Sequence, residues 1–153
     1  MTLFMRMGLW LGASFMPDVE VSSSPASDNP ASVIRLERDP LTIHGTPLST
    51  LYGLLNLMEE ASAAAAHFTV PALFMYGAHD ELIPKEATLA TWRAVRGGSH
   101  RLAFYPNGWH LLLRDIDRAT PIGDAIAWIH DHAAPLPSGM DLNALARLAG
   151  EPA

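Results

Sequence analysis

The chain reads Val70-Pro-Ala-Leu-Phe-Met-Tyr-Gly-Ala-His-Asp80, then a helical pattern, then Arg101-Leu-Ala-Phe-Tyr-Pro-Asn-Gly-Trp-His110. Each quoted stretch holds a short apolar run, 72–76 and 102–105, closed by glycine or by proline and glycine, which is typical of a buried parallel strand. Parallel strands joined by a helical crossover bring their carboxyl ends to one edge of a sheet. The sequence therefore predicts that Asp80 and His110 lie side by side where open α/β sheets carry ligands and chemistry.

An aspartate beside a histidine supplies two of the three side chains of a hydrolytic triad. The carboxylate fixes the tautomer of the imidazole and stabilises the imidazolium that forms during proton transfer. Taken singly, Asp80 would equally suit the cap of a turn, and His110 would suit an ordinary loop. The pair, each member following a strand, favours catalysis.

Two pieces of the chain, Gly77-Ala-His-Asp80-Glu-Leu-Ile-Pro84 and Asn107-Gly-Trp-His110, resemble α/β-hydrolases of the monoacylglycerol lipase and lysophospholipase type. In that fold the chain order is nucleophile, acid, histidine. The resemblance implies that Asp80 is the triad acid and His110 the general base. A third piece, residues 28–41 with a proline near each end, is similar to the cap segment of the same group.

The nucleophile of such an enzyme is not found in this chain. A Gly-x-Ser-x-Gly elbow lies on a strand-to-helix turn before the acid. Gly12-Ala-Ser14 lacks the second glycine and a preceding strand, and Gly97-Gly-Ser99 lacks the second glycine and follows a helical pattern. No oxyanion loop of the His-Gly-Gly type is present, and two strands are predicted where the family sheet has about eight.

We therefore expect an α/β fold that is the C-terminal portion of an α/β-hydrolase, with two parallel strands and flanking helices preceded by a helical cap segment. The expected division places the cap or lid in residues 1–67, the C-terminal part of the hydrolase core in 68–134, and a tail in 135–153 that could hold a short helix over 141–148. Within the cap, residues 18–29 are expected to be a polar loop that packs little.

Amphipathic patterns predict three helices around the strands. The longest covers residues 47–67, and its apolar stripe consists of Leu48, Leu51, Leu55 and Met58. The crossover helix is expected to begin at Pro84 and the last helix at Thr120-Pro121, because proline suits the first turn. The inner stripe expected for the last helix consists of Ile122, Ala125, Ile126 and Ile129.

The first 16 residues are apolar with one charge and predict a helix with Met7, Trp10 and Leu11 on one stripe. Such residues are typical of a core, and they would also suit a lipid-facing lid that binds substrate, since methionine adapts to greasy surfaces. A secretory signal is not expected, because no clear small-x-small cleavage site follows.

Composition excludes several classes of function. The formal net charge is -6 and the chain has a single lysine, so no basic cluster is available for nucleic acid. No cysteine is present, and His130 and His132 beside Asp131 suit a frayed helix end better than a metal site. We expect no metal and no cofactor. No apolar run reaches the roughly 18 residues of a spanning helix, and a cytoplasmic or membrane-peripheral location is expected.

Two classes of function compete. In the first, the chain is part of a serine hydrolase acting on lipid-like esters, and its partner is the missing N-terminal half or a second copy. In the second, it is a non-catalytic remnant or a partner-binding fragment with the same scaffold. The same fold also supports epoxide or haloalkane hydrolysis, in which an aspartate is the nucleophile. An acid and a histidine alone do not distinguish these reactions from ester hydrolysis.

Overall fold

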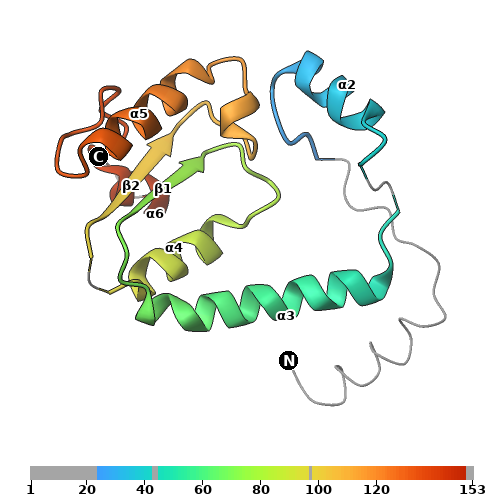
Figure 1. Ribbon diagram of the computed structural model, residues 1–153, viewed down its shortest axis with the longest axis horizontal. Helices are drawn as coiled ribbons and strands as arrows, with labels where there is room; N and C mark the ends of the chain where they lie inside the picture. The colour runs from blue at the N-terminus through green and yellow to red at the C-terminus, as the bar shows by residue number, and fades with distance from the viewer. Residues whose placement is uncertain (1–23, 43–44, 97, 151–153) are drawn as a thin grey trace.

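The computed structural model describes residues 24–42, 45–96 and 98–150. The predicted N-terminal helix, with the predicted lid residues Met7, Trp10 and Leu11, lies outside this part of the chain. Figure 1 shows the elements in order: α2 (Pro30–Arg38), α3 (Leu48–Ala64), η1 (Ala65–His67), β1 (Ala72–Gly77), α4 (Lys85–Ala94), β2 (His100–Tyr105), η2 (Leu112–Arg114), α5 (Ala119–His130) and α6 (Ala144–Ala149).

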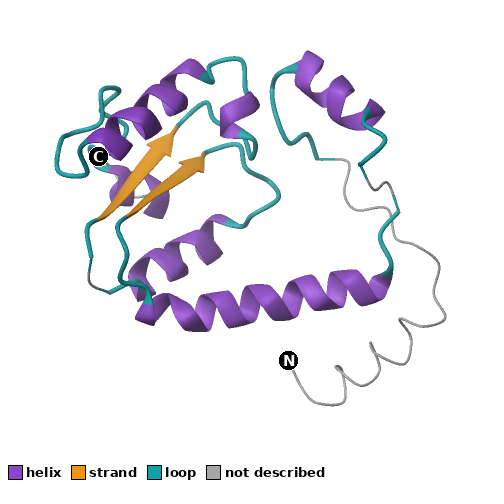
Figure 2. Cartoon of the chain, viewed as in Figure 1, coloured by secondary structure: helices purple, strands orange, loops and turns teal. Residues whose placement is uncertain are grey.

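The two predicted strands are parallel neighbours, as expected. Their register pairs Ala72 with His100 and continues to Gly77 opposite Tyr105. Helix α4 makes the crossover between them (Figure 2). Within the described ranges the sheet has these two strands, and β1 pairs only with β2. The carboxyl ends of both strands therefore meet at one edge, which is where the candidate site lies.

Both faces of the strand pair are covered, which explains why the strands read as continuous apolar runs. Side chains alternate between two clusters along each strand. One cluster, on the face covered by α4 and α6, consists of Tyr76, Leu102, Ala144 and Leu148, with Phe74, Leu89, Trp92 and Phe104 packed against it. The other, on the face covered by α5, consists of Ala103, Tyr105, Leu112 and Leu136, with Leu73, Met75, Trp128 and Met140.

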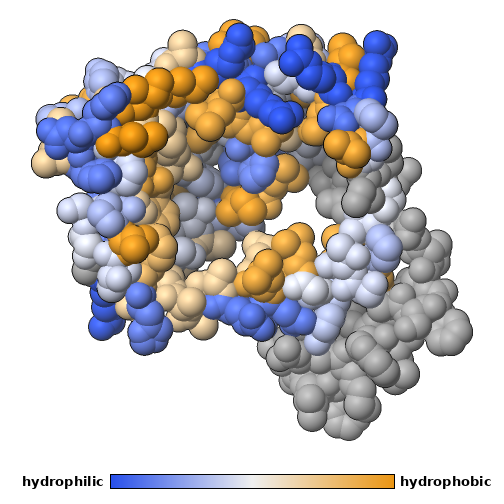
Figure 3. Space-filling model, in the orientation of Figure 1, coloured by the Kyte–Doolittle hydropathy of each residue, from blue (hydrophilic) through white to orange (hydrophobic). Residues whose placement is uncertain are grey.

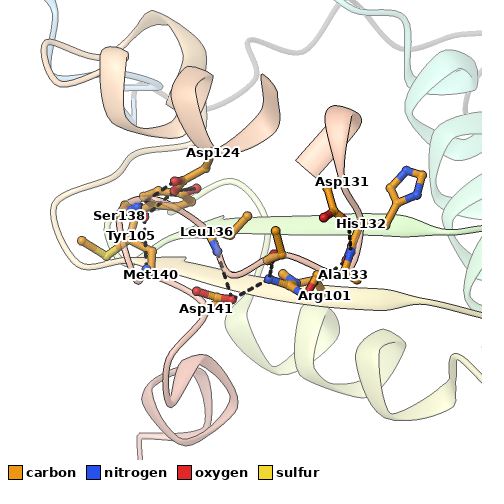
Figure 4. A network of polar contacts seen from close by, with 11 residues as sticks. Arg101, Tyr105, Asp124, Asp131, His132, Ala133, Leu136, Ser138, Met140 and Asp141 are labelled. Atoms are coloured by element: carbon orange, nitrogen blue, oxygen red, sulfur yellow. Dashed lines mark hydrogen bonds and ion pairs between the residues drawn. The ribbon is translucent and has the colours of Figure 1, made fainter. Parts of the chain in front are cut away.

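The segment that we expected to be a tail is packed into both clusters. Leu136 belongs to one, and Leu148 on α6 is 0% exposed in the other. Arg101 ties the same segment to β2, because its guanidinium donates to Asp141 Oδ2 at 3.0 Å and to backbone carbonyl oxygens of residues 132–134 (Figure 4). The short length and the prolines of this segment hid its two deeply buried leucines from sequence reasoning.

The prediction for the inner face of α5 was wrong. Ile126 and Ile129 are 52% and 66% exposed, and the residues of α5 that are buried are Pro121 and Asp124. Asp124 turns inward because Tyr105 Oη donates to it at 2.8 Å and the hydroxyl and N–H of Ser138 also donate to it (Figure 4). A buried carboxylate needs such donors, and this network fixes the rotation of the helix.

Two further helices differ from expectation in detail. In the predicted apolar stripe of α3, Leu55 and Met58 are exposed and the other two leucines are half-buried, and full burial begins only after the helix, at Ala65 of η1. Pro84 stands just before α4 rather than at its first position, and α5 begins at Ala119, so that Pro121 is its third residue. Pro121 lies in the first turn of its helix and Pro84 directly before one, and neither position requires an N–H for the helix. None of the helices in the described ranges is long and apolar enough to cross a membrane.

Candidate active site

The loops that follow β1 and β2 cross at two glycines. A Cβ added to Gly77 would overlap the carbonyl group of Gly108 and lie 2.7 Å from Trp109 O. The close approach lets the loops bond to each other, with Ala78 N–H donating to Tyr105 O and His79 N–H to Gly108 O, both at 2.9 Å. Glycine is therefore required at this crossing, and the crossing sets the distance between the two loops.

Asp80 is fixed by both of its carboxylate oxygens. Its Oδ1 accepts from the N–H groups of Leu82 and Ile83, each at 2.9 Å, and its Oδ2 lies 3.0 Å from His110 Nδ1. The side chain of Asp80 is 8% exposed, against 34% for that of His110. Asp80 thus caps its own turn and pairs with the histidine at the same time, so the two interpretations of this residue coexist.

The turn that carries Asp80 is supported from β1. Tyr76 Oη donates to the carbonyl oxygen of Ile83 at 2.9 Å. Burial raises the pKa of Tyr76, and the negative charges of Asp80 and Glu86 raise it further. The phenol therefore remains protonated and able to donate across the neutral pH range.

The contact with Asp80 decides which nitrogen of His110 carries a proton. A carboxylate only accepts hydrogen bonds, so Nδ1 must donate, and Nε2 of the neutral ring holds a free lone pair. This is the tautomer that a general base requires. The ring adjoins an apolar hollow, which is lined by Met75, Leu111, Leu112, Leu113 and Arg114.

The loop around His110 is held by residues that no local sequence pattern marks. Trp109 N–H donates to Asp115 at 2.8 Å, and Asp115 also accepts from Ser27 Oγ at 2.6 Å. The His79 ring stacks on Trp109, with ring centroids 5.2 Å apart. Ser27 lies in the loop expected to pack little, yet it is buried. A separation of 88 residues in sequence left no local pattern to reveal this contact.

Other candidate residues do not join this site. Ser99 precedes β2, whereas His110 follows it, so the two lie beyond opposite ends of the strand. Ser14 lies outside the described residues. Helix α5 ends at His130, and the His132 ring contacts Trp128 at a centroid distance of 4.3 Å. In the part of the chain that the structure describes, no group of three or more His, Cys, Asp or Glu residues is placed to hold a metal ion.

Parallel strands whose carboxyl-end loops bring an aspartate next to a histidine, in that chain order, agree with the α/β-hydrolase fold. The chain belongs to the hydrolase family described as serine aminopeptidase, S33, whose model matches residues 1–117. This family membership agrees with the class that the fold indicates.

Two relatives extend the comparison. The chain is 25% identical over 118 residues to the monoacylglycerol lipase of Mycolicibacterium smegmatis, an alignment that covers 76% of this chain and 42% of that protein. The crystal structure of the Paleococcus ferrophilus monoacylglycerol lipase matches with a TM-score of 0.70 at 19% identity, over 87% of this chain and 54% of that one. The second match shows the fold. The chain spans about half the length of the relatives it matches.

Proposed function

We propose that this chain supplies the triad acid and the general base of a serine ester hydrolase that acts on lipid-like esters, monoacylglycerols or lysophospholipids. The observation that carries the proposal is the 3.0 Å contact between Asp80 Oδ2 and His110 Nδ1 at the carboxyl edge of the strand pair. Membership in a serine hydrolase family supports it.

In the proposed mechanism Asp80 orients the ring of His110, and Nε2 takes the proton from a serine hydroxyl that another part of the enzyme supplies. The serine oxygen then attacks the ester carbonyl, and His110 returns the proton to the leaving alcohol. Asp80 stabilises the imidazolium between these two transfers. The oxyanion donors also come from the part that bears the serine.

A lipid-like substrate is favoured by the surroundings of His110. The hollow beside its ring is lined mainly by apolar side chains, those of Met75 and the leucines 111–113. An acyl chain would bury apolar surface there, which is favourable at about 25 cal/mol per Å². Both compared relatives are named as monoacylglycerol lipases. The predicted lid residues Met7, Trp10 and Leu11 would add to such a surface.

The part that bears the serine would dock on the open side of the strand pair. The outer edge of β1 has no strand partner in the described ranges, and the exposed isoleucines of α5 are Ile122, Ile126 and Ile129. Figure 3 shows the visible face hollowed at its centre, with apolar surface bordering the opening. A sheet that continued from β1 would pair that edge and cover apolar side chains.

The proposal is tested by combining this chain with a separately expressed N-terminal half that carries a Gly-x-Ser-x-Gly elbow. We expect the chain alone to give no turnover of a short-chain nitrophenyl ester and no labelling by a fluorophosphonate probe. The mixture should hydrolyse the ester and label the serine of the added half. His110→Ala or Asp80→Ala should remove both signals, whereas His130→Ala, at the exposed end of α5, should keep them.

Two outcomes would overturn the proposal. Labelling of Ser99 or Ser14 in the chain alone would mean that the nucleophile is present here. A mixture that associates but is inactive and unlabelled would favour the second class of function, a non-catalytic scaffold. A preference for long-chain over short-chain esters in the active mixture would support the lipid-like substrate class.

A further inference from the structure

The loop that carries His110 is fastened on both sides of that residue. The N–H of Trp109 donates to Asp115 Oδ2 at 2.8 Å, and the N–H of Leu111 donates to the carbonyl oxygen of Ala26 at 2.8 Å. Bonded peptide groups on either side of a residue fix the course of its backbone and therefore the direction in which its side chain leaves. Both bonds come from outside the turn itself.

Asp115 is held in turn by Ser27. Asp115 is 3% exposed, and its Oδ1 accepts from the buried hydroxyl of Ser27 at 2.6 Å. Each carboxylate oxygen thus has one donor, the serine hydroxyl for one and the Trp109 N–H for the other. A buried carboxylate oxygen without a donor is strongly unfavourable, so loss of the hydroxyl would displace Asp115 toward water and release Trp109.

We infer that Ser27 and Asp115 form a positioning pair that aims His110 at Asp80. They act through the peptide N–H of Trp109, the residue directly before His110, and not by contact with substrate. The inference rests on the proposed role of His110. The hydrogen bond between His110 and Asp80, which the pair is proposed to hold in place, is present whether or not the chain has activity.

Hydrogen bonds from residues 26–29, the segment that enters α2, connect this segment to the loop that carries His110. Asp28 Oδ1 accepts from Ile116 N–H at 2.8 Å, and the N-cap residue of α2, Asn29, donates from Nδ2 to Arg114 O at 3.0 Å. Residues 26–29 therefore lie along the His110 loop from one end to the other. A displacement of this segment would be transmitted to His110 through Ser27 and Asp115.

The test is made on the isotope-labelled full chain by nuclear magnetic resonance. The readout is the Nδ1 proton of His110, which is protected from exchange with water while it is bonded to Asp80. Ser27→Ala and Asp115→Ala should speed its exchange by about tenfold or more, or remove its signal, the size of effect expected when a buried hydrogen bond is lost. The amide signals of β1 and β2 should be unchanged in Ser27→Ala.

Two further variants separate positioning from general loosening. Asp115→Asn should keep the slow exchange, because its amide group can accept from Trp109 N–H and donate to Ser27 Oγ. Ser32→Ala removes another serine that bonds the same loop, through Oγ to Arg114 O at 3.1 Å, and should leave the His110 signal as it is.

The inference would be overturned if the Nδ1 proton of His110 exchanged in Ser27→Ala at the wild-type rate. It would also be overturned if Ser32→Ala lost this signal as completely as Ser27→Ala does. If Asp115→Ala does not fold, Ser27→Ala and Ser32→Ala still decide between these outcomes. The exchange measurement does not require catalytic turnover. A negative exchange result would therefore leave the proposed function intact, and an inactive reconstituted enzyme would leave the positioning role of Ser27 and Asp115 intact.

Discussion

At the scale of single residues, the site depends on a contact between two backbones. Gly77→Ala places a methyl group into the carbonyl of Gly108, which cannot move without shifting the loop that carries His110. We expect a loss of unfolding free energy of about 1–3 kcal/mol from overpacking and a weakened hydrogen bond between Asp80 and His110. Urea denaturation measures the first effect, and exchange of the His110 Nδ1 proton measures the second.

A matched control is available in the same chain. Gly53 lies inside α3, and a Cβ added there meets nothing within 4 Å. Gly53→Ala should raise the unfolding free energy by about 0.5–1 kcal/mol, because alanine is the better helix former. A Gly77→Ala chain as stable as wild type, with an intact His110 signal, would show that the crossing tolerates separation and does not set the geometry of the pair.

What the sequence revealed at this scale was the local chemistry. Asp80 and His110 could be found because each follows an apolar strand in a motif of recognisable composition. Their roles in catalysis remain predictions, while the distance between them agrees with the expected pairing. Ser27 and Asp115 could not be found, since their contact depends on a fold that joins residues 88 apart. No local pattern distinguishes them from ordinary polar loop residues.

At the scale of elements, Asp124 decides how α5 sits on the sheet. Periodicity favoured the isoleucine stripe as the inner face because it takes account of apolar residues only. The hydrogen bonds that Tyr105 and Ser138 donate to Asp124 depend on tertiary structure and leave no periodic pattern in the sequence. The strands were predicted correctly because both of their faces are covered, so their apolar runs are continuous. A helix with two sides of similar apolarity has no such unambiguous signal.

The Tyr105–Asp124 bond makes the stability of the chain sensitive to alkaline pH. Burial raises the pKa of Tyr105 far above its ordinary 10.0, and the hydrogen bond and the charge of Asp124 raise it further. The unfolded chain therefore releases this proton near pH 10 while the folded chain retains it. The stabilising effect is complete below pH 10 and declines above it by about 1.4 kcal/mol for each further pH unit.

Urea denaturation between pH 9 and 11.5 measures this dependence, and phenolate absorbance should show that Tyr105 ionises only as the chain unfolds. Tyr105→Phe should make the alkaline decline shallower, with the remainder due to Tyr76, whose pKa is also raised. The substitution also lowers stability at neutral pH by about 1–3 kcal/mol, because Asp124 loses a donor. A decline that persists unchanged in Tyr105→Phe would assign the effect to another group.

The exposed face of α5 gives a second prediction at this scale. Ile126→Ser should change the unfolding free energy of the chain by no more than about 0.5 kcal/mol, as at other exposed sites. Leu148→Ala, at a fully buried position on α6, should cost about 2–5 kcal/mol. Urea denaturation of both variants makes the comparison. A cost for Ile126→Ser close to that of Leu148→Ala would mean that α5 packs with its isoleucines inward.

At the scale of the whole molecule, the chain has more apolar surface than its own elements cover. The edge of β1 is open in the described ranges, the isoleucines of α5 are exposed, and α3 lies away from the sheet along much of its length (Figures 1 and 3). A two-stranded sheet is marginal by itself, and an open apolar edge is a template for association. This uncovered apolar surface supports the proposal that another part of the enzyme packs against the chain, which spans about half the length of the relatives it matches.

We therefore expect the purified chain to self-associate or to bind a hydrophobic dye at neutral pH. Light scattering should give a mass above the 16.6 kDa of one chain.

Lysine at both Ile126 and Ile129 should lower dye binding and association, because charges on that face oppose its burial. Glutamine at Glu59 and Glu60, exposed residues of α3 that are already polar, gives the same change in net charge, serves as the matched control and should leave both unchanged. Addition of the N-terminal half should suppress dye binding as well, because it covers the same surface. A monomer that melts cooperatively without binding dye would mean that the exposed apolar surface needs no cover, and the proposal of a nucleophile-bearing half that docks there would then lose its structural basis.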